Sequence, residues 1–237
     1  MKRPELRLSA IATLVLLACA ACSSGSDDGI DVTTSWLGSL HRYERVSGTE
    51  QFGVYLMKGG TRPAHVGQII VGSAEITISA RSDLNAISPA AYEELRAAFA
   101  KALEREAAQR FAAKPGASGP ADTADTYILR AALTNLTVKR KSRNFGPVGL
   151  NDLEFTFDDA AIELVLHEKR SNARRGVIVQ KAEGPVARRN ALADRFRSLA
   201  ARAAEKTAEA RDGINRKAAL PVAPALAPAK PSEPSKK

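Results

Sequence analysis

The apolar residues of this chain fall into two patterns, and the first of them predicts β-strands. Alternating or β-branched apolar runs bounded by glycine, proline or asparagine are typical of strands. Such runs occupy 52–57, 66–78, 127–138, 153–167 and 177–181. In the fourth run the apolar positions change from odd to even numbers across Asp158-Asp159-Ala160. This change requires an extra residue, so we expect a β-bulge there.

The second pattern repeats every three or four residues and predicts two long helices. The first begins at Ser88-Pro89, where a hydroxyl N-cap precedes the residue favoured at the first helical position, and its apolar stripe ends at Phe111. The second is expected over 187–212, with Gly213 as its C-terminal stop. After Lys217 the chain is rich in alanine, proline and lysine, which favours an extended, solvated conformation.

The order strands, helix, three strands, helix predicts an α+β protein. We expect a two-layer sandwich with a mostly antiparallel sheet and two long helices on one face. The last three strands should be antiparallel neighbours, and the strand before the first helix should join them in parallel through a right-handed crossover. The sequence thus divides into a signal at 1–18, a flexible tether at 19–35, a single domain at 36–213 and a disordered tail at 214–237.

Residues 1–18 have the composition of an export signal. Three basic residues precede the apolar run Leu8–Ala18, which is too short to span a bilayer. A cysteine follows small residues at the end of this run, so the segment resembles the signal peptide of a bacterial lipoprotein. In such proteins the mature chain begins at a lipid-modified cysteine. Cys19 is the favoured site of lipidation, and Cys22 is the alternative.

This resemblance implies a place in the cell. Several acyl chains, palmitate among them, would bind the mature protein durably to a lipid bilayer. Neither Ala20 nor Ser23 is the aspartate that retains enteric lipoproteins on the inner membrane. The expected location is therefore the cell envelope, at the periplasmic face of the outer membrane. Nucleic acid is not an expected partner there.

The formal net charge of +9 favours anionic partners in the envelope. If the strands run antiparallel, the basic loop after the 127–138 strand lies at the same end of the sheet as the start of the second helix. The candidate anion-binding residues are Lys139, Arg140, Lys141, Arg143, Arg188 and Arg189. Arginine forks suit phosphate groups, and the alternative is an ordinary solvated loop.

No catalytic motif is present, and no cofactor is expected. His41, His65 and His167 lie in separate segments, so they do not form a local ligand set for a metal. Asp158-Asp159 and Glu154 could act as paired carboxylates, but acidic residues at a bulge are more often solvated. The C-terminal Lys236-Lys237 resembles, in a limited way, the wall-linked end of the murein lipoprotein, and otherwise belongs to a simple spacer.

A series of segments resembles one family along most of the predicted domain. The segments are Trp36-Leu37-Gly38 with Tyr43, Val54-Tyr55-Leu56, Gly67–Val71 with Ala74-Glu75-Ile76, Ile128–Thr134, and the Ala160–Leu164 to Lys169–Asn172 hairpin. In this order they resemble proteobacterial lipoproteins of about this length that are known only as a domain of unknown function. The usual acidic-glycine turn of the hairpin is replaced here by Ser171-Asn172-Ala173. The resemblance implies an exported lipoprotein without known chemistry.

Together these features predict a membrane-anchored periplasmic lipoprotein that acts as a non-enzymatic binding or scaffolding module of the cell envelope. Its expected partners are the bilayer, an anionic envelope lipid or polymer, and an envelope protein complex. The alternatives are a hydrolase of an envelope polymer and an accessory lipoprotein of a transport system. A hydrolase would need a cleft in which two or more ionisable groups converge.

Overall fold

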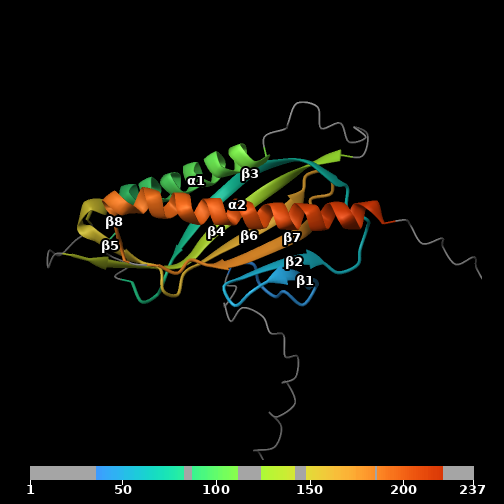
Figure 1. The fold of residues 1–237 in the computed structure, drawn as a ribbon. Helices are drawn as coiled ribbons and strands as arrows, with labels where there is room; N and C mark the ends of the chain where they lie inside the picture. The colour runs from blue at the N-terminus through green and yellow to red at the C-terminus, as the bar shows by residue number, and fades with distance from the viewer. Residues whose placement is uncertain (1–35, 83–86, 112–123, 142–147, 185, 221–237) are drawn as a thin grey trace, which may run out of the picture.

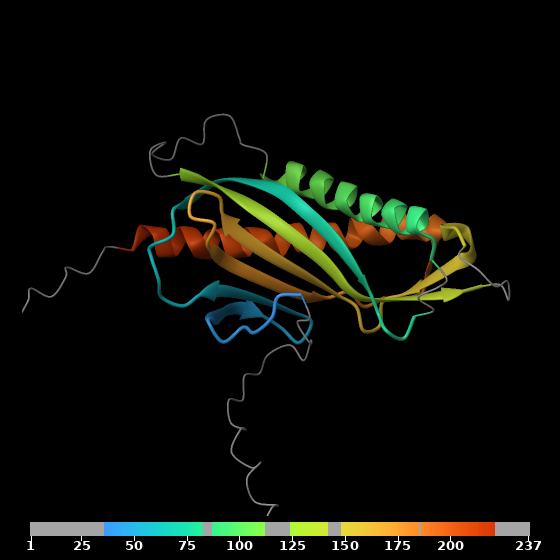
Figure 2. The same ribbon diagram turned by 180° about the vertical axis from the view of Figure 1, so that it is seen from behind.

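A single sheet with two helices on one face forms the fold (Figures 1 and 2). The computed structural model describes residues 36–82, 87–111, 124–141, 148–184 and 186–220. Its strands are β1 (Tyr43–Gly48), β2 (Phe52–Met57), β3 (His65–Ile78), β4 (Ala124–Arg140), β5 (Leu153–Thr156), β6 (Ala161–Glu168), β7 (Arg174–Lys181) and β8 (Ala187–Arg188). The helices are α1 (Pro89–Phe111), α2 (Arg189–Ala219) and the 3-10 turn η1 (Leu150–Asp152). The predicted α+β two-layer sandwich is confirmed.

The sheet is antiparallel except for one pair of strands. Its order is β1-β2-β7-β6-β4-β5-β8, and β3 pairs in parallel with β4. The predicted antiparallel set β4-β6-β7 and the predicted parallel entry of the strand before α1 are both confirmed. β4 is the central strand, because it pairs with β3, with β6 and, at its far end, with β5. In the described residues no helix is long and apolar enough to cross a bilayer.

The predicted long strand over 153–167 is interrupted where its apolar positions change parity. β6 pairs with the first part of β4, and β5 pairs with its last part. A turn lies between them, closed by the N–H of Ala160, which donates to the carbonyl of Phe157 at 3.1 Å. The prediction of one strand with a bulge is therefore wrong in detail, because the insertion is large enough to separate two strands. Opposite it, Asn135 of β4 has φ 57°, a conformation that asparagine tolerates better than most residues.

The main core lies between the sheet and the helices. Phe99 of α1 and Phe196 of α2 are fully buried, and their rings meet edge to face with centroids 5.5 Å apart. The expected N-cap of α1 is confirmed: Ser88 Oγ accepts the N–H of Ala91 at 3.2 Å. β1 was not predicted, because Tyr43 and Val46 are the only large apolar residues in an exposed edge strand.

The second helix differs from its prediction at both ends. Ala187 and Arg188 form β8 against β5, so α2 begins at Arg189. Gly213 does not stop the helix; it is buried inside it, and the helix continues to Ala219. A Cβ at Gly213 would lie 2.7 Å from Leu56 Cδ1 of β2. This glycine therefore allows α2 to approach the sheet closely.

In the described part of the chain, the opposite face of the sheet carries no helix. A smaller apolar cluster lies there, formed by Tyr55, Val165, Val177 and Val179. Leu37 is buried in this cluster and Trp36 packs against it. The start of the described domain therefore covers part of the face that the helices leave open.

The close approach at Gly213 predicts a side-chain-size effect. Gly213→Val should lower the free energy of unfolding by about 1–3 kcal/mol, because the added methyl groups would overlap Leu56. Ala219→Val, at the exposed end of the same helix, is the matched control and should cost less than about 1 kcal/mol. Urea unfolding of both variants measures the difference. Equal effects would mean that α2 does not need a small residue at this position.

Candidate functional site

The predicted cationic loop and helix start do meet at one end of the sheet. Lys141 Nζ donates to the carbonyl of Asn151 at 2.7 Å, and Arg189 Nη1 donates to its side-chain oxygen at 3.0 Å. Lys139 is exposed near the end of β4, and Arg140 is partly buried beside it. Arg143 lies outside the described residues. We call Lys139, Arg140, Lys141, Arg188 and Arg189 the cationic rim.

Carboxylates neutralise part of the cationic rim. Arg188 Nε lies 3.1 Å from Glu154 Oε1, and Arg189 Nη2 lies 2.8 Å from Glu94 Oε1. Exposed pairs of this kind contribute little to stability. They do supply counter-charges at Arg188 and Arg189, two of the six residues that were expected to bind an anion. Two of the five residues of the rim are therefore already paired with carboxylates.

A second group of charged residues lies on the sheet face without helices. They line a hollow of about 200 Å³, and each comes from a different strand. The ionisable groups are Glu75 of β3, Arg130 of β4, His167 of β6 and Arg174 of β7; Trp36, Leu37 and Val165 complete the lining. Arg174 is the register partner of His167, and Arg130 is that of Val165. We call this the polar hollow.

The side chains of the polar hollow are unevenly paired. Trp36 Nε1 donates to Glu75 Oε2 at 3.1 Å. Arg174 Nη1 makes a long contact of 3.5 Å to the carbonyl of Leu37. Among the described residues, neither Arg130 nor Arg174 forms an ion pair with a carboxylate. The hollow thus brings together two guanidinium groups and one carboxylate.

His167 is buried in the lining of the polar hollow. It is 7% exposed, and its Nδ1 has no hydrogen-bond partner among the described residues. Burial lowers the pKa of His167, and the charges of Arg130 and Arg174 lower it further, against a backbone hydrogen bond with Asn172 that raises it. The imidazole is therefore neutral at neutral pH.

A buried carboxylate beside the polar hollow holds the start of the domain. Glu163 is fully buried in β6, and its Oε2 accepts the N–H of Leu37 at 2.9 Å and that of Trp36 at 3.2 Å. Its Oε1 accepts the hydroxyl of Thr134 at 2.9 Å. We call this arrangement the Glu163 clamp. It fixes the point at which the chain enters the folded domain.

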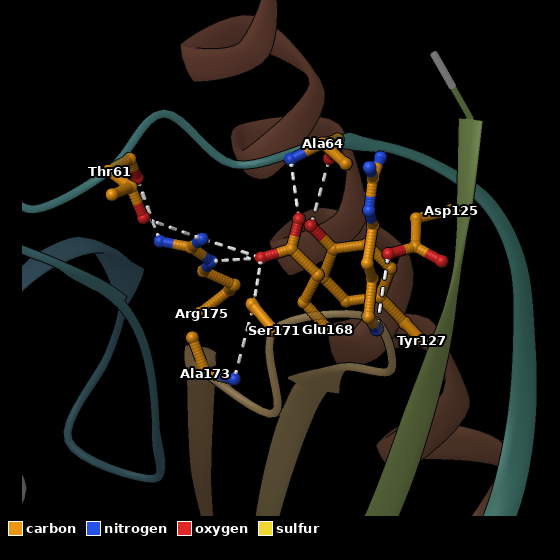
Figure 3. A network of polar contacts seen from close by, with 9 residues as sticks. Thr61, Ala64, Asp125, Tyr127, Glu168, Ser171, Ala173 and Arg175 are labelled. Carbon is orange, nitrogen blue, oxygen red and sulfur yellow. Dashed lines mark hydrogen bonds and ion pairs between the residues drawn. The ribbon is translucent and has the colours of Figure 1, made fainter. Parts of the chain in front are cut away.

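Glu168 and Arg175, which directly follow His167 and Arg174 in β6 and β7, form a buried ion pair, shown in Figure 3. Glu168 Oε2 accepts Nε of Arg175 at 2.8 Å, and both side chains are almost fully buried. Glu168 Oε1 accepts the N–H of Ala64 at 2.8 Å, and Arg175 Nη1 donates to the carbonyl of Thr61 at the same distance. The network therefore ties the connection between β2 and β3 to β6 and β7. Because it joins separate elements of the fold, we assign this network a structural role.

The environment of Glu168 changes its titration. Burial alone would raise its pKa, but the hydrogen bonds from Ser171, from the N–H of Ala64 and from Arg175, with the charge of Arg175, outweigh burial and lower it. Burial also raises the pKa of Tyr127, whose hydroxyl donates to the carbonyl of Ala64 at 2.8 Å. Glu168 is therefore ionised and Tyr127 neutral at physiological pH.

A larger groove adjoins this network. Its volume is about 440 Å³, and Arg175 lies in its wall. Met57, Pro63 and Ile214 give it an apolar lining, and Leu220, which is 63% exposed, stands at its edge. It lies between the β2–β3 connection and the C-terminal end of α2. Nothing in the described residues shows what covers it.

The carboxylates considered for acid-base chemistry form ion pairs with different arginines. Asp159 pairs with Arg81 at 2.5 Å, whereas Glu154 pairs with Arg188. Within the described ranges, no three His, Cys, Asp or Glu side chains gather to hold a metal ion. Cys19 and Cys22 lie outside those ranges.

Sequence reasoning missed both the polar hollow and the Glu163 clamp. A signal for the clamp existed, because Glu163 is the single charged residue inside the apolar run Ala160–Leu166. The hollow had no comparable signal. His167 and Arg174 belong to one hairpin, but Glu75 and Arg130 are far from them in the sequence, and the strand register brings the four groups together.

Comparisons with known proteins find only distant structural similarity. No family model matches it, and no curated protein matches it. Among solved structures, it is similar to a PelC dodecamer from Paraburkholderia phytofirmans, with 15% identity over 67% of this chain and 98% of that chain, at a TM-score of 0.28. A substituted form of the same protein gives 13% identity, 65% and 95% coverage and the same TM-score. Scores this low support no conclusion about the fold or the function.

The buried ion pair predicts acid-sensitive stability. Because the pKa of Glu168 is lowered on folding, its contribution is fully present above the ordinary value of 4.5 and is lost as the pH falls below it. At pH 7, Glu168→Gln should cost about 3 kcal/mol, since it leaves Arg175 buried without a counter-charge. The difference from the wild type should shrink toward pH 3 in urea unfolding.

The exposed pair at the other end of the sheet supplies the control for this prediction. Glu154→Gln should cost less than about 1 kcal/mol at both pH values, because its ion pair with Arg188 is solvated. A pH-independent cost of Glu168→Gln would contradict the assigned role of its charge.

Proposed function

We propose that this protein is an acylated lipoprotein of the cell envelope that acts as a non-enzymatic binding or scaffolding module. Cys19 carries the lipid, with Cys22 as the alternative. The lipid is inserted in the outer membrane, and the domain lies at its periplasmic face. The observation that carries this proposal is the Glu163 clamp. The lipid-bearing segment joins the domain at the clamp, on the sheet face without helices.

The clamp is suited to a domain that is attached to a membrane through its N-terminal segment. A load applied through the N-terminal segment reaches a buried strand at the centre of the sheet, because Glu163 lies in β6 between β4 and β7. A carboxylate that accepts two backbone N–H groups also holds the chain in one direction. The clamp thereby fixes the chain at Trp36 and Leu37, where the described domain begins.

The lining of the polar hollow favours binding over hydrolysis. It contains one histidine and one carboxylate, but no serine, threonine or cysteine that could serve as a nucleophile. It contains no second carboxylate to form an acid-base pair with Glu75. The alternative proposals are an envelope-polymer hydrolase, which this lining disfavours, and an accessory role in a transport system.

Metabolic labelling with palmitate tests the anchor. In a bacterial host that processes lipoproteins, the wild-type chain and Cys22→Ala should incorporate label, and Cys19→Ala should lose it completely. The reverse result would move the modification to Cys22. A wild-type chain without label would overturn the lipoprotein proposal.

Hydrogen exchange tests the clamp. Glu163→Ala removes the acceptor of three hydrogen bonds, so the N–H of Leu37 should lose its protection and the domain about 2 kcal/mol of stability. Glu75→Ala removes only the side-chain contact to Trp36 and is the matched control. Protection of Leu37 that survives in Glu163→Ala would show that apolar packing alone holds this segment.

A further inference from the structure

We infer that the polar hollow is a binding site for one oxyanion group, a phosphate or a carboxylate, held by Arg130 and Arg174 over His167. This inference specifies the ligand chemistry of the proposed binding module, but it does not depend on the acylated anchor. No feature of the sequence assigned a site here. The strand register creates it.

The geometry of the polar hollow provides the first support. Arg130 and Arg174 come from β4 and β7, on either side of the strand that carries His167. Their side chains line the same hollow, although two like charges repel each other unless an anion lies between them. Guanidinium forks match the planar or tetrahedral oxygens of carboxylate and phosphate.

The charges of the polar hollow provide the second support. Its lining has two positive groups and one negative group, and Glu75 is already hydrogen-bonded to Trp36. One singly charged oxyanion would balance this excess. The arginines of the cationic rim differ, because Arg188 and Arg189 already have carboxylate partners.

His167 provides the third support. The imidazole lines the hollow, in the strand between the two that carry Arg130 and Arg174, so a bound oxyanion would lie close to it. The groups that face the imidazole are Arg130, Arg174 and Glu75, so a bound anion would offset the two positive charges and raise the pKa of His167.

A titration with inorganic phosphate tests the site. The acylated full-length protein, held in a neutral detergent, is observed through the ring signals of His167 by NMR. Phosphate should shift these signals saturably and raise the pKa of His167. Arg130→Gln and Arg174→Gln should each weaken the affinity at least about tenfold. Both side chains are exposed, so the variants should fold normally.

Arg188→Gln is the matched control, since it removes the same charge from the cationic rim. It should leave phosphate affinity within about twofold of the wild type. Signals of His167 that do not respond to phosphate would overturn the inference. So would a loss of affinity in Arg188→Gln that equals the loss in Arg130→Gln.

Nanodiscs distinguish a lipid headgroup from a free oxyanion. The acylated protein is placed in phosphatidylcholine discs with or without phosphatidylglycerol. A His167 shift that requires phosphatidylglycerol, and that Arg174→Gln abolishes, would identify a lipid phosphate as the ligand. A shift with dissolved phosphate alone would identify a soluble ligand. If palmitate labelling fails, the phosphate titration of the unacylated full-length chain still tests this inference, because the hollow lies in the domain and not in the anchor.

Discussion

The parallel pairing of β3 with β4 constrains the rest of the structure. Parallel neighbours need a crossover connection, and here α1 supplies it on one face of the sheet. α2 then packs beside α1, where Phe99 and Phe196 meet. Both helices therefore lie on the same face, and the other face is left to side chains and to the entering chain.

The face without helices can carry polar groups for this reason. A helix packed there would have to bury Arg130 and Arg174, which would be costly without partners. Among the described residues, the start of the domain covers part of this face, beside the polar hollow. The buried side chain of Glu163 is hydrogen-bonded there by the N–H groups of Trp36 and Leu37. Attachment and candidate binding thus share one surface.

The sequence predicted the layers better than the local details. The apolar stripes of α1 and α2 and the β-branched runs of β3 and β6 determined the fold class, because burial depends on periodicity alone. Gly213 misled the prediction of the helix end, since a glycine needed for close packing looks the same as a helix stop. The site residues depended on register between distant strands, which one sequence does not reveal.

The pairing of β2 with β7 has a consequence for folding. Phe52 lies opposite Gln180, so a strand near the start of the domain finds its partner near the end. Folds dominated by such distant pairings have a high contact order and form slowly. The sheet cannot close until nearly the whole chain has been synthesised. A nascent chain of this kind therefore completes its sheet only late in synthesis.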